Sequence, residues 1–164
     1  MNFKFINYNI IYLKMSTLES IRDCDIEEFN LKGKKLNGKV VDIYDGDTCK
    51  IVVELDGKLV KFSCRLLGIN APEIKPLKNK ENREQEKSNA KKCRNRLFEL
   101  CTNCSLDDNK KIKDEIDNNR KLVTVECFDW DKYGRLLVSI YDLNSDKSFN
   151  SILLEENLVK PYLL

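Results

Sequence analysis

Residues 39–67 read KVVDIYDGDTCKIVVELDGKLVKFSCRLL, and this stretch decides the fold. β-Branched and apolar residues dominate three runs, separated by short turns, and such runs are typical of strands. The turns are Asp45-Gly46-Asp47 and the two-residue hairpin signal Asp56-Gly57. In the third run apolar and polar side chains alternate, so one face packs on a core. The stretch therefore predicts a three-stranded meander, with strands over residues 39–44, 48–55 and 59–67.

Downstream of the meander, helical and strand patterns alternate. Asn82-x-x-Gln85 resembles a capping box and predicts the start of a long helix. The apolar stripe of this helix has helical spacing and consists of Ala90, Cys93, Leu97 and Cys101. After a polar segment at residues 102–121, we expect strands over 122–128 and 135–141, then a helix capped by Ser148 that runs to Leu154 and stops at Asn157. Five strands and two or three helices predict a mainly β, α+β fold: a five-stranded β-barrel of the oligonucleotide-binding (OB) type.

The composition excludes several classes of function. The chain has 164 residues, of which 41% are hydrophobic and 34% charged, as is typical of a globular domain. Lys and Arg number 29 against 27 Asp and Glu, so the chain is no histone-like polycation, although a local basic surface is compatible with this total. The absence of histidine excludes Ser-His-Asp and Cys-His catalysis and zinc sites of the mixed Cys/His type.

Domain organisation follows from where the regular patterns begin. Residues 1–37 form a leader, predicted to be flexible or partly helical, ahead of a barrel domain at residues 38–164 with an inserted polar loop near 102–121. Residues 1–14 are too few and too rich in Asn to span a bilayer, and they lack the small-residue cleavage site of a signal peptide. We therefore expect an intracellular monomer with no membrane partner.

The seven cysteines are odd in number, and several lie in expected strands or on the helix stripe. Cys64, for example, shares a strand face with Phe62. Small buried thiols in a reducing compartment are the simplest interpretation. A zinc or redox site would instead need Cys101-x-x-Cys104 together with distant partners such as Cys93 and Cys127. The cysteines occupy positions 24, 49, 64, 93, 101, 104 and 127.

Three segments carry residue types suited to phosphate chemistry: Asp45-Gly-Asp-Thr48, Arg65-Leu-Leu-Gly-Ile-Asn-Ala-Pro-Glu73 and Asp131-Lys-Tyr-Gly-Arg135. Taken singly, the first is an ordinary turn, the second contains a solvated arginine and the third opens a hairpin. Taken in order and at matching strand ends, they resemble the staphylococcal nuclease (thermonuclease) family over about residues 38–162. The resemblance implies an OB-type barrel and a calcium-dependent endonuclease that hydrolyses phosphodiesters of DNA and RNA.

The resemblance also implies a role for each matching residue. The metal ligands would be Asp47, Asn70 and the main chain of Ala71, holding Ca²⁺ or, alternatively, Mg²⁺ or Mn²⁺. The catalytic residues would be Glu73, as the base toward water, with Arg65 and Arg135 on the scissile phosphate. The substrate contacts would come from Lys132, Tyr133 and Tyr162. Asp45 is either a turn residue or an accessory carboxylate beside Asp47.

Elementary chemistry supports such a site without histidine. A phosphodiester is an anion that repels hydroxide, so its hydrolysis needs charge neutralisation and an oriented water. A hard divalent cation on carboxylate oxygens supplies Lewis acidity, and the planar arginine fork matches phosphate oxygens. A carboxylate can orient or deprotonate the water. We expect the four charged groups to meet because side chains at strand ends and adjoining loops converge on one rim of a small barrel.

Two positions depart from the family pattern. Asn70 stands where the family has a second calcium-binding Asp, and Ala71 stands where it usually has Thr. Calcium affinity follows ligand charge, so the neutral Asn70 oxygen predicts a metal site that is weakened or shifted toward another divalent ion. Titration of metal against activity in the native chain and in Asn70→Asp tests this expectation, and coincident curves would contradict it.

Residues 75–96 are strongly basic, with nine Lys and Arg against three Glu. Beside the candidate site this segment would collect a polyanion; alternatively it is a solvated helix face with Glu/Lys pairs. Charge reversal at Lys91 and Lys92 should flatten the salt dependence of binding only if these lysines touch phosphate.

Three classes of function therefore remain. The Glu73 carboxylate and the two arginines favour a metal-dependent nuclease acting on DNA or RNA. Asn70 favours a catalytically weak module that binds nucleic acid or a protein partner. A cysteine-based zinc or redox protein ranks third, because only Cys101-x-x-Cys104 supports it.

Overall fold

The computed structural model of the chain describes residues 19–22, 26–79, 81–106 and 111–163. Contacts between residues divide the chain into two compact units, Met1–Asn30 and Leu31–Leu164. Every helix and strand named below lies in the second unit. Residues 1–14, Cys24 and Lys80, which entered the sequence interpretation, lie outside the described residues.

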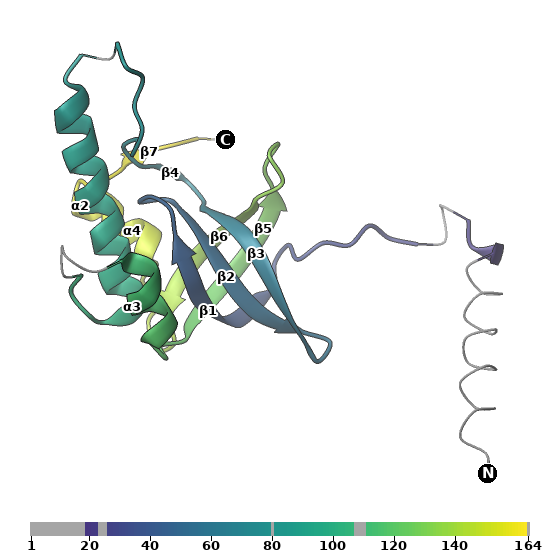
Figure 1. Cartoon of the computed structure of the whole chain (residues 1–164). Helices are drawn as coiled ribbons and strands as arrows, with labels where there is room; N and C mark the ends of the chain where they lie inside the picture. The colour runs from purple at the N-terminus through teal and green to yellow at the C-terminus, as the bar shows by residue number, and fades with distance from the viewer. Residues whose placement is uncertain (1–18, 23–25, 80, 107–110, 164) are drawn as a thin grey trace. The chain divides into compact units, whose positions relative to one another are not determined.

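The second unit contains a closed barrel of five strands: β1 Lys35–Ile43, β2 Thr48–Leu55, β3 Lys58–Leu66, β5 Val123–Trp130 and β6 Leu136–Asp142. Their order around the ring is β1-β2-β3-β6-β5 (Figure 1). All neighbours are antiparallel except β3 and β6, which pair in parallel. A separate two-stranded sheet joins β4 Ile69–Asn70 to β7 Lys160–Pro161. The predicted α+β, OB-like barrel is therefore confirmed.

The meander follows the sequence pattern closely. β2 has the predicted bounds, and β3 differs by one residue at each end. Asp56 and Gly57 have φ values of 50° and 74°, as a two-residue type I′ turn between strands requires. β1 begins at Lys35, four residues before its prediction, because its first residues pair with β5. A strand start that depends on a distant partner leaves no local signal.

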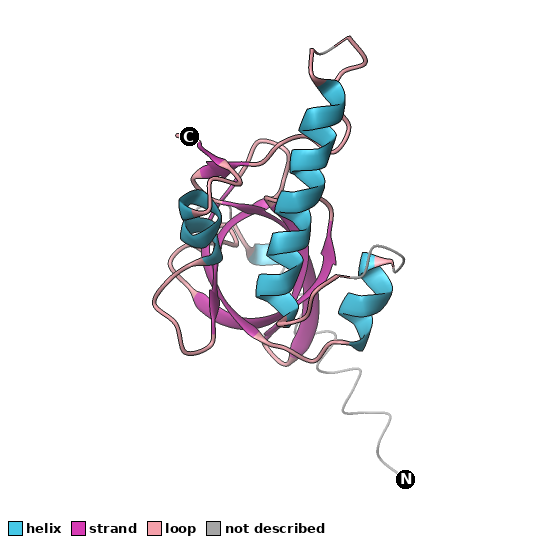
Figure 2. Ribbon diagram, turned by 90° about the vertical axis from the view of Figure 1, so that its left-hand side faces the viewer, coloured by secondary structure: helices cyan, strands magenta, loops and turns pink. Residues whose placement is uncertain are grey.

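Among the described residues, three helices pack on the barrel: α2 Arg83–Thr102, α3 Ile112–Asn118 and α4 Phe149–Glu155. In Figure 2, α2 passes in front of the ring of strands. No helix in the described part of the chain has both the length and the apolar character needed to cross a membrane. The α4 prediction is confirmed, since Ser148 Oγ accepts the Ser151 N–H at 3.1 Å and Asn157 follows with φ 55°.

Two predictions about the helices need correction. Asn82 does precede α2, but it has a left-handed conformation and its side chain makes no capping hydrogen bond, so the capping box is wrong. The segment 102–121 is not merely an exposed loop, because α3 lies inside it. Ile116 of α3 is 1% exposed and belongs to the hydrophobic core. Because α3 has only seven residues, its apolar positions are too few to show a helical period among the surrounding charged residues.

The turn between β1 and β2 is fixed by its packing on α2. A Cβ atom at Gly46 would lie 2.0 Å from Cys93 Sγ, so only glycine fits at this position. The predicted apolar stripe of α2, which includes Cys93, is fully buried. Packing between the turn and α2 therefore sets the positions of Asp45 and Asp47 on either side of Gly46.

The six described cysteines are free thiols, and all except Cys104 are buried. Burial raises the pKa of the Cys64, Cys93 and Cys101 thiols to about 12. These side chains therefore stay protonated at neutral pH and are poor nucleophiles and poor metal ligands.

Candidate functional site

One cavity of about 520 Å³ gathers side chains from all three sequence segments. The parallel pairing of β3 with β6 brings the second and third segments together. Cys64 lies opposite Leu136, so Arg135, which precedes β6, lies beside β3, the strand that carries Arg65. Ten of the twelve residues proposed from the sequence line this candidate-site cavity: Asp45, Asp47, Arg65, Asn70, Ala71, Glu73, Lys132, Tyr133, Arg135 and Tyr162.

Asp47 and Arg65 form a largely buried ion pair in this cavity, with 3% and 14% of their side chains exposed. Arg65 Nη1 donates to Asp47 Oδ1 over 2.7 Å, and Nη2 donates to Asn70 Oδ1 over 2.9 Å. Asp47 Oδ1 also accepts the Thr48 hydroxyl at 3.0 Å, and Oδ2 accepts the Ala71 N–H at 2.6 Å. The β2–β3 register places Thr48 directly opposite Arg65. Both Asp47 oxygens are thus hydrogen bonded.

Arg135 is held by Asp131 at the other end of its turn. Arg135 Nε donates to Asp131 Oδ2 over 2.7 Å, and the backbone N–H groups of Tyr133 and Arg135 both donate to Oδ1 over 2.9 Å. Desolvation opposes ionisation of Asp131, but these hydrogen bonds prevail and lower its pKa. Arg135 Nη1 donates weakly to Thr48 Oγ1 over 3.4 Å, and Nη2 has no partner among the described residues. Arg135 therefore presents an unused donor at the cavity.

Glu73 is exposed and lies in the loop after β4. Its backbone N–H donates to Glu86 Oε1 over 3.2 Å, which ties this loop to α2. The Glu73 carboxylate makes no hydrogen bond or ion pair with any described residue, in contrast to the carboxylates of Asp47 and Asp131. It is therefore free to contact a water molecule in the cavity.

Two exposed tyrosines flank the arginines. Tyr133 is 73% exposed, and the cations of Lys132 and Arg135 lie 5.2 and 5.5 Å from its ring centroid. Tyr162 is 46% exposed, with the Arg65 guanidinium 5.7 Å from its ring centroid. Such cation–π contacts keep the aromatic rings beside the cationic groups.

Asp45, Asp47 and Asn70 line the cavity, and their side-chain oxygens are ligands of the kind that Ca²⁺ accepts. Within the described residues, no three His, Cys, Asp or Glu side chains cluster closely enough to hold a metal ion. The third oxygen comes from the amide of Asn70, and Arg65 already occupies oxygens of both Asp47 and Asn70. Ala71 contacts Asp47 through its N–H. The described residues therefore offer a divalent cation two carboxylates and one amide oxygen, several of whose oxygen atoms already accept hydrogen bonds.

Asp45 accepts the Asp47 N–H at 3.0 Å, so it is a turn residue, and its carboxyl also lines the cavity. Desolvation, reinforced by the nearby Asp47 charge, raises the pKa of Asp45 to about 6. Because this value lies above the ordinary 3.8, the folded state favours the protonated carboxyl. The stability that Asp45 contributes is complete below about pH 4 and is lost as the pH rises through about 6.

Replacement of Asp45 by Asn should therefore stabilise the protein at neutral pH. Asn keeps the acceptor for the Asp47 N–H but carries no charge. Since Asp45 is partly solvated, we expect a gain of only about 1–2 kcal/mol in the free energy of unfolding at pH 7, and almost none at pH 4. Urea unfolding in a chelator at both pH values measures this difference, and an equal gain at pH 4 and pH 7 would contradict the assignment.

Lys91 and Lys92, the remaining two predicted residues, do not line the candidate-site cavity. Both are exposed on α2. Lys92 instead borders a neighbouring cavity of about 420 Å³ that shares Asn70 and Ala71 with the candidate site. Neither lysine therefore lies in the cavity that contains Arg65 and Arg135.

Three residues of the site had received no role from the sequence: Tyr44 and Thr48, which line the cavity, and Asp131, which holds Arg135. Thr48 and Asp131 lay inside the quoted motifs, and a pairing argument from the β2–β3 register would have found Thr48. Tyr44 precedes the Asp45-Gly46-Asp47 turn and gave no signal, because a single exposed tyrosine beside a turn has no distinctive pattern.

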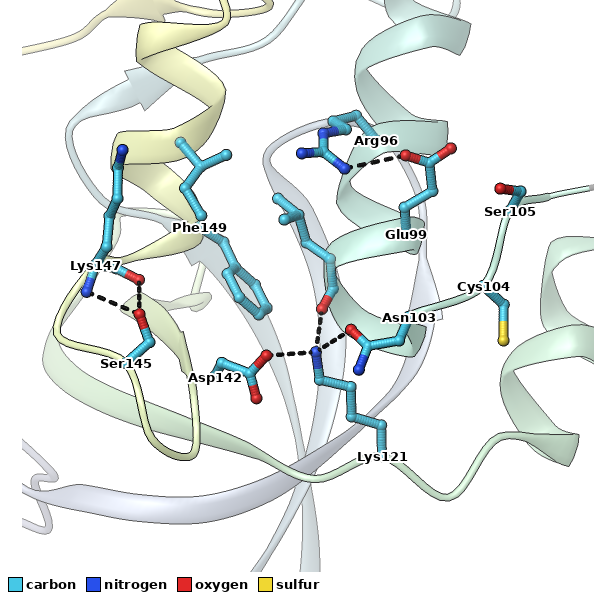
Figure 3. Close-up of a pocket in the computed structure, with 12 residues that line it drawn as sticks. Arg96, Glu99, Asn103, Cys104, Ser105, Lys121, Asp142, Ser145, Lys147 and Phe149 are labelled. Atoms are coloured by element: carbon cyan, nitrogen blue, oxygen red, sulfur yellow. Dashed lines mark hydrogen bonds and ion pairs between the residues drawn. The ribbon is translucent and has the colours of Figure 1, made fainter.

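A separate cavity of about 450 Å³ lies between the C-terminal end of α2 and α4 and shares no residue with the candidate site (Figure 3). Its main feature is Lys121, whose ammonium donates to Leu100 O, Asn103 Oδ1 and Asp142 Oδ2 over 2.8, 2.7 and 2.9 Å. The Phe149 ring lies 5.6 Å from the same ammonium. Through these contacts Lys121 joins the C-terminal end of α2 to Asp142 of β6 and Phe149 of α4.

We expect Lys121→Met to destabilise the fold by about 2–3 kcal/mol, because three acceptors remain in place and lose the largely buried ammonium that donates to them. The matched control is Lys147→Met, since Lys147 pairs with Glu155 where both side chains are at least half exposed. That variant should change stability by less than about 0.5 kcal/mol. Urea unfolding of both variants measures the contrast, and similar losses would show that the Lys121 cluster is unimportant.

No protein-family model matches the chain, and a search of curated proteins found no match.

Proposed function

We propose that the protein is a metal-dependent nuclease that hydrolyses phosphodiester bonds of DNA or RNA. The observation that carries this proposal is the presence of Asp47, Arg65, Glu73 and Arg135 around one cavity, although they come from separate parts of the chain. The resemblance of the three motifs to the staphylococcal nuclease family points to the same activity. The family assignment is part of the proposal.

The two arginines have the chemistry to bind and polarise a phosphodiester. Arg135 is anchored through Nε and retains Nη2 for a phosphate oxygen. Arg65 is anchored to Asp47 and Asn70, and its positive charge faces the same cavity. Two fixed guanidinium groups stabilise the extra negative charge that develops when water attacks phosphorus.

The Glu73 carboxylate is suited to receive the proton of the attacking water. It lines the cavity and is not committed to any described residue, so it can accept a hydrogen bond from water near the phosphate. A divalent cation held by Asp47, Asp45 and Asn70 would supply further charge neutralisation and Lewis acidity. Such binding requires Arg65 to share Asp47 Oδ1, which agrees with a weak metal site.

The direct test is incubation of the full chain with single-stranded DNA and with RNA in the presence of Ca²⁺, Mg²⁺, Mn²⁺ or a chelator. We expect cleavage with at least one of the metals and none in the chelator. Cleavage that persists in the chelator would overturn the proposed mechanism. No cleavage under any condition would overturn the nuclease proposal.

A second candidate function is a catalytically weak module that binds nucleic acid or a protein partner. The observation that favours it is the bonding of Arg65 to both Asp47 and Asn70, which occupies oxygens that a metal would need. This candidate predicts retention of labelled oligonucleotide without cleavage, and the same incubations distinguish it from the first.

A further inference from the structure

A smaller cleft adjoins the candidate-site cavity on the side of Tyr44. It has a volume of about 310 Å³ and shares Tyr44, Thr48, Tyr133 and Arg135 with that cavity. We call it the Tyr44 cleft. Since four residues line both spaces, a molecule with a phosphate at Arg135 has the cleft directly beside it.

Two of the four shared residues are aromatic, Tyr44 and Tyr133, and they differ in how their rings are packed. Tyr44 is 55% exposed, and neither its ring nor its hydroxyl makes a hydrogen bond, ring contact or cation–π contact with a described residue. The ring of Tyr133, by contrast, already contacts Lys132 and Arg135. The backbone of Tyr44 is fixed, because its N–H donates to Thr48 O over 2.9 Å. The ring is therefore presented from a rigid turn.

The remaining lining has little net charge. Lys50 and Asp42, which both line the cleft, pair with each other over 3.0 Å. The cleft therefore suits a flat, neutral group better than a second phosphate, which would meet the Asp42 carboxylate. In a polynucleotide, the flat neutral group attached near each phosphate is the nucleobase, and bases stack on exposed aromatic rings.

We propose that the Tyr44 cleft is a nucleobase subsite, in which the base of the nucleotide next to the Arg135-bound phosphate stacks on the Tyr44 ring. This inference rests on the proposed function, since it assumes that a polynucleotide phosphate binds at Arg135. It adds a residue that selects a base-bearing strand over a bare polyanion.

The experiment measures equilibrium binding in a chelator, where the proposed cleavage does not occur. The probes are a fluorescently labelled single-stranded oligonucleotide and an abasic oligomer of equal length, with the same sugars and phosphates but no bases. The variants are Tyr44→Ala and Tyr44→Phe, and the matched control is Leu59→Ala, which removes an exposed apolar side chain outside both cavities. Circular dichroism confirms that each variant is folded.

Stacking of one base corresponds to about a 5- to 150-fold change in affinity. We expect Tyr44→Ala to weaken binding of the intact strand within this range and to leave binding of the abasic oligomer unchanged. Tyr44→Phe and Leu59→Ala should bind like the native chain. Equal effects on both probes, no effect on the intact strand, or no binding by the native chain would each overturn the inference. A Tyr44-dependent affinity in a protein that cleaves nothing would support the subsite and reject only the nuclease activity.

Discussion

Replacement of Glu73 by Gln should lower kcat by about 10²–10⁴-fold, because the proposed base loses the ability to accept the proton of water. The same change should leave the free energy of unfolding within about 0.5 kcal/mol of the native value, since surface substitutions of this kind are nearly neutral. Glu73 is exposed and its carboxylate has no partner among the described residues. Activity and stability should therefore respond separately.

The measurement is the initial rate of oligonucleotide cleavage with saturating metal, together with urea unfolding of the same preparations. Glu81→Gln is the matched control, because Glu81 is exposed, lies in the same loop before α2 and does not line the cavity. It should retain native activity. An active Glu73→Gln variant would remove Glu73 from the mechanism, while loss of activity in both variants would point to a general effect of charge.

The barrel was predictable because its strands carry local signals. β2 and β3 alternate polar and apolar residues, and the turn at Asp56-Gly57 needs the positive φ values that these residues tolerate. β1 was too short in the prediction because Lys35–Asn37 become strand only by pairing with β5. The same limit hid α3, whose few apolar residues gain meaning only when Ile116 packs into the core.

The candidate site was predictable as a set of residues but not as a set of bonds. Motif order indicated that Asp47, Arg65 and Arg135 would approach one another, and all three line one cavity. The direct bond between Arg65 and Asp47 depends on the β2–β3 register, which places Thr48 opposite Arg65. Tyr44 received no role from the sequence, because the proposed role depends on the cleft that Tyr44 lines, and no sequence pattern indicates a cleft.

The largest combined effect is expected at Arg65. Arg65→Ala leaves the Asp47 carboxylate, only 3% exposed, with neutral donors alone. Removing one partner of a buried ion pair destabilises a protein by about 3–5 kcal/mol, and we expect a loss in that range. Because a fixed cation at the proposed phosphate site is lost as well, kcat should fall by about 10²–10³-fold.

Arg65→Lys separates the two roles of Arg65. A lysine restores a positive charge near Asp47 and should recover most of the stability. One ammonium cannot reproduce the planar fork that reaches Asp47, Ile69 O and Asn70 together, so activity should remain low. Lys61→Ala is the control, because Lys61 lies on the same face of β3 but is exposed, and it should change stability by less than about 0.5 kcal/mol. The measurements are urea unfolding and cleavage rates of the three variants. If Arg65→Ala is as stable as Lys61→Ala, the Asp47–Arg65 pair does not stabilise the site. If Arg65→Lys is fully active, the proposed binding of phosphate does not depend on the guanidinium fork.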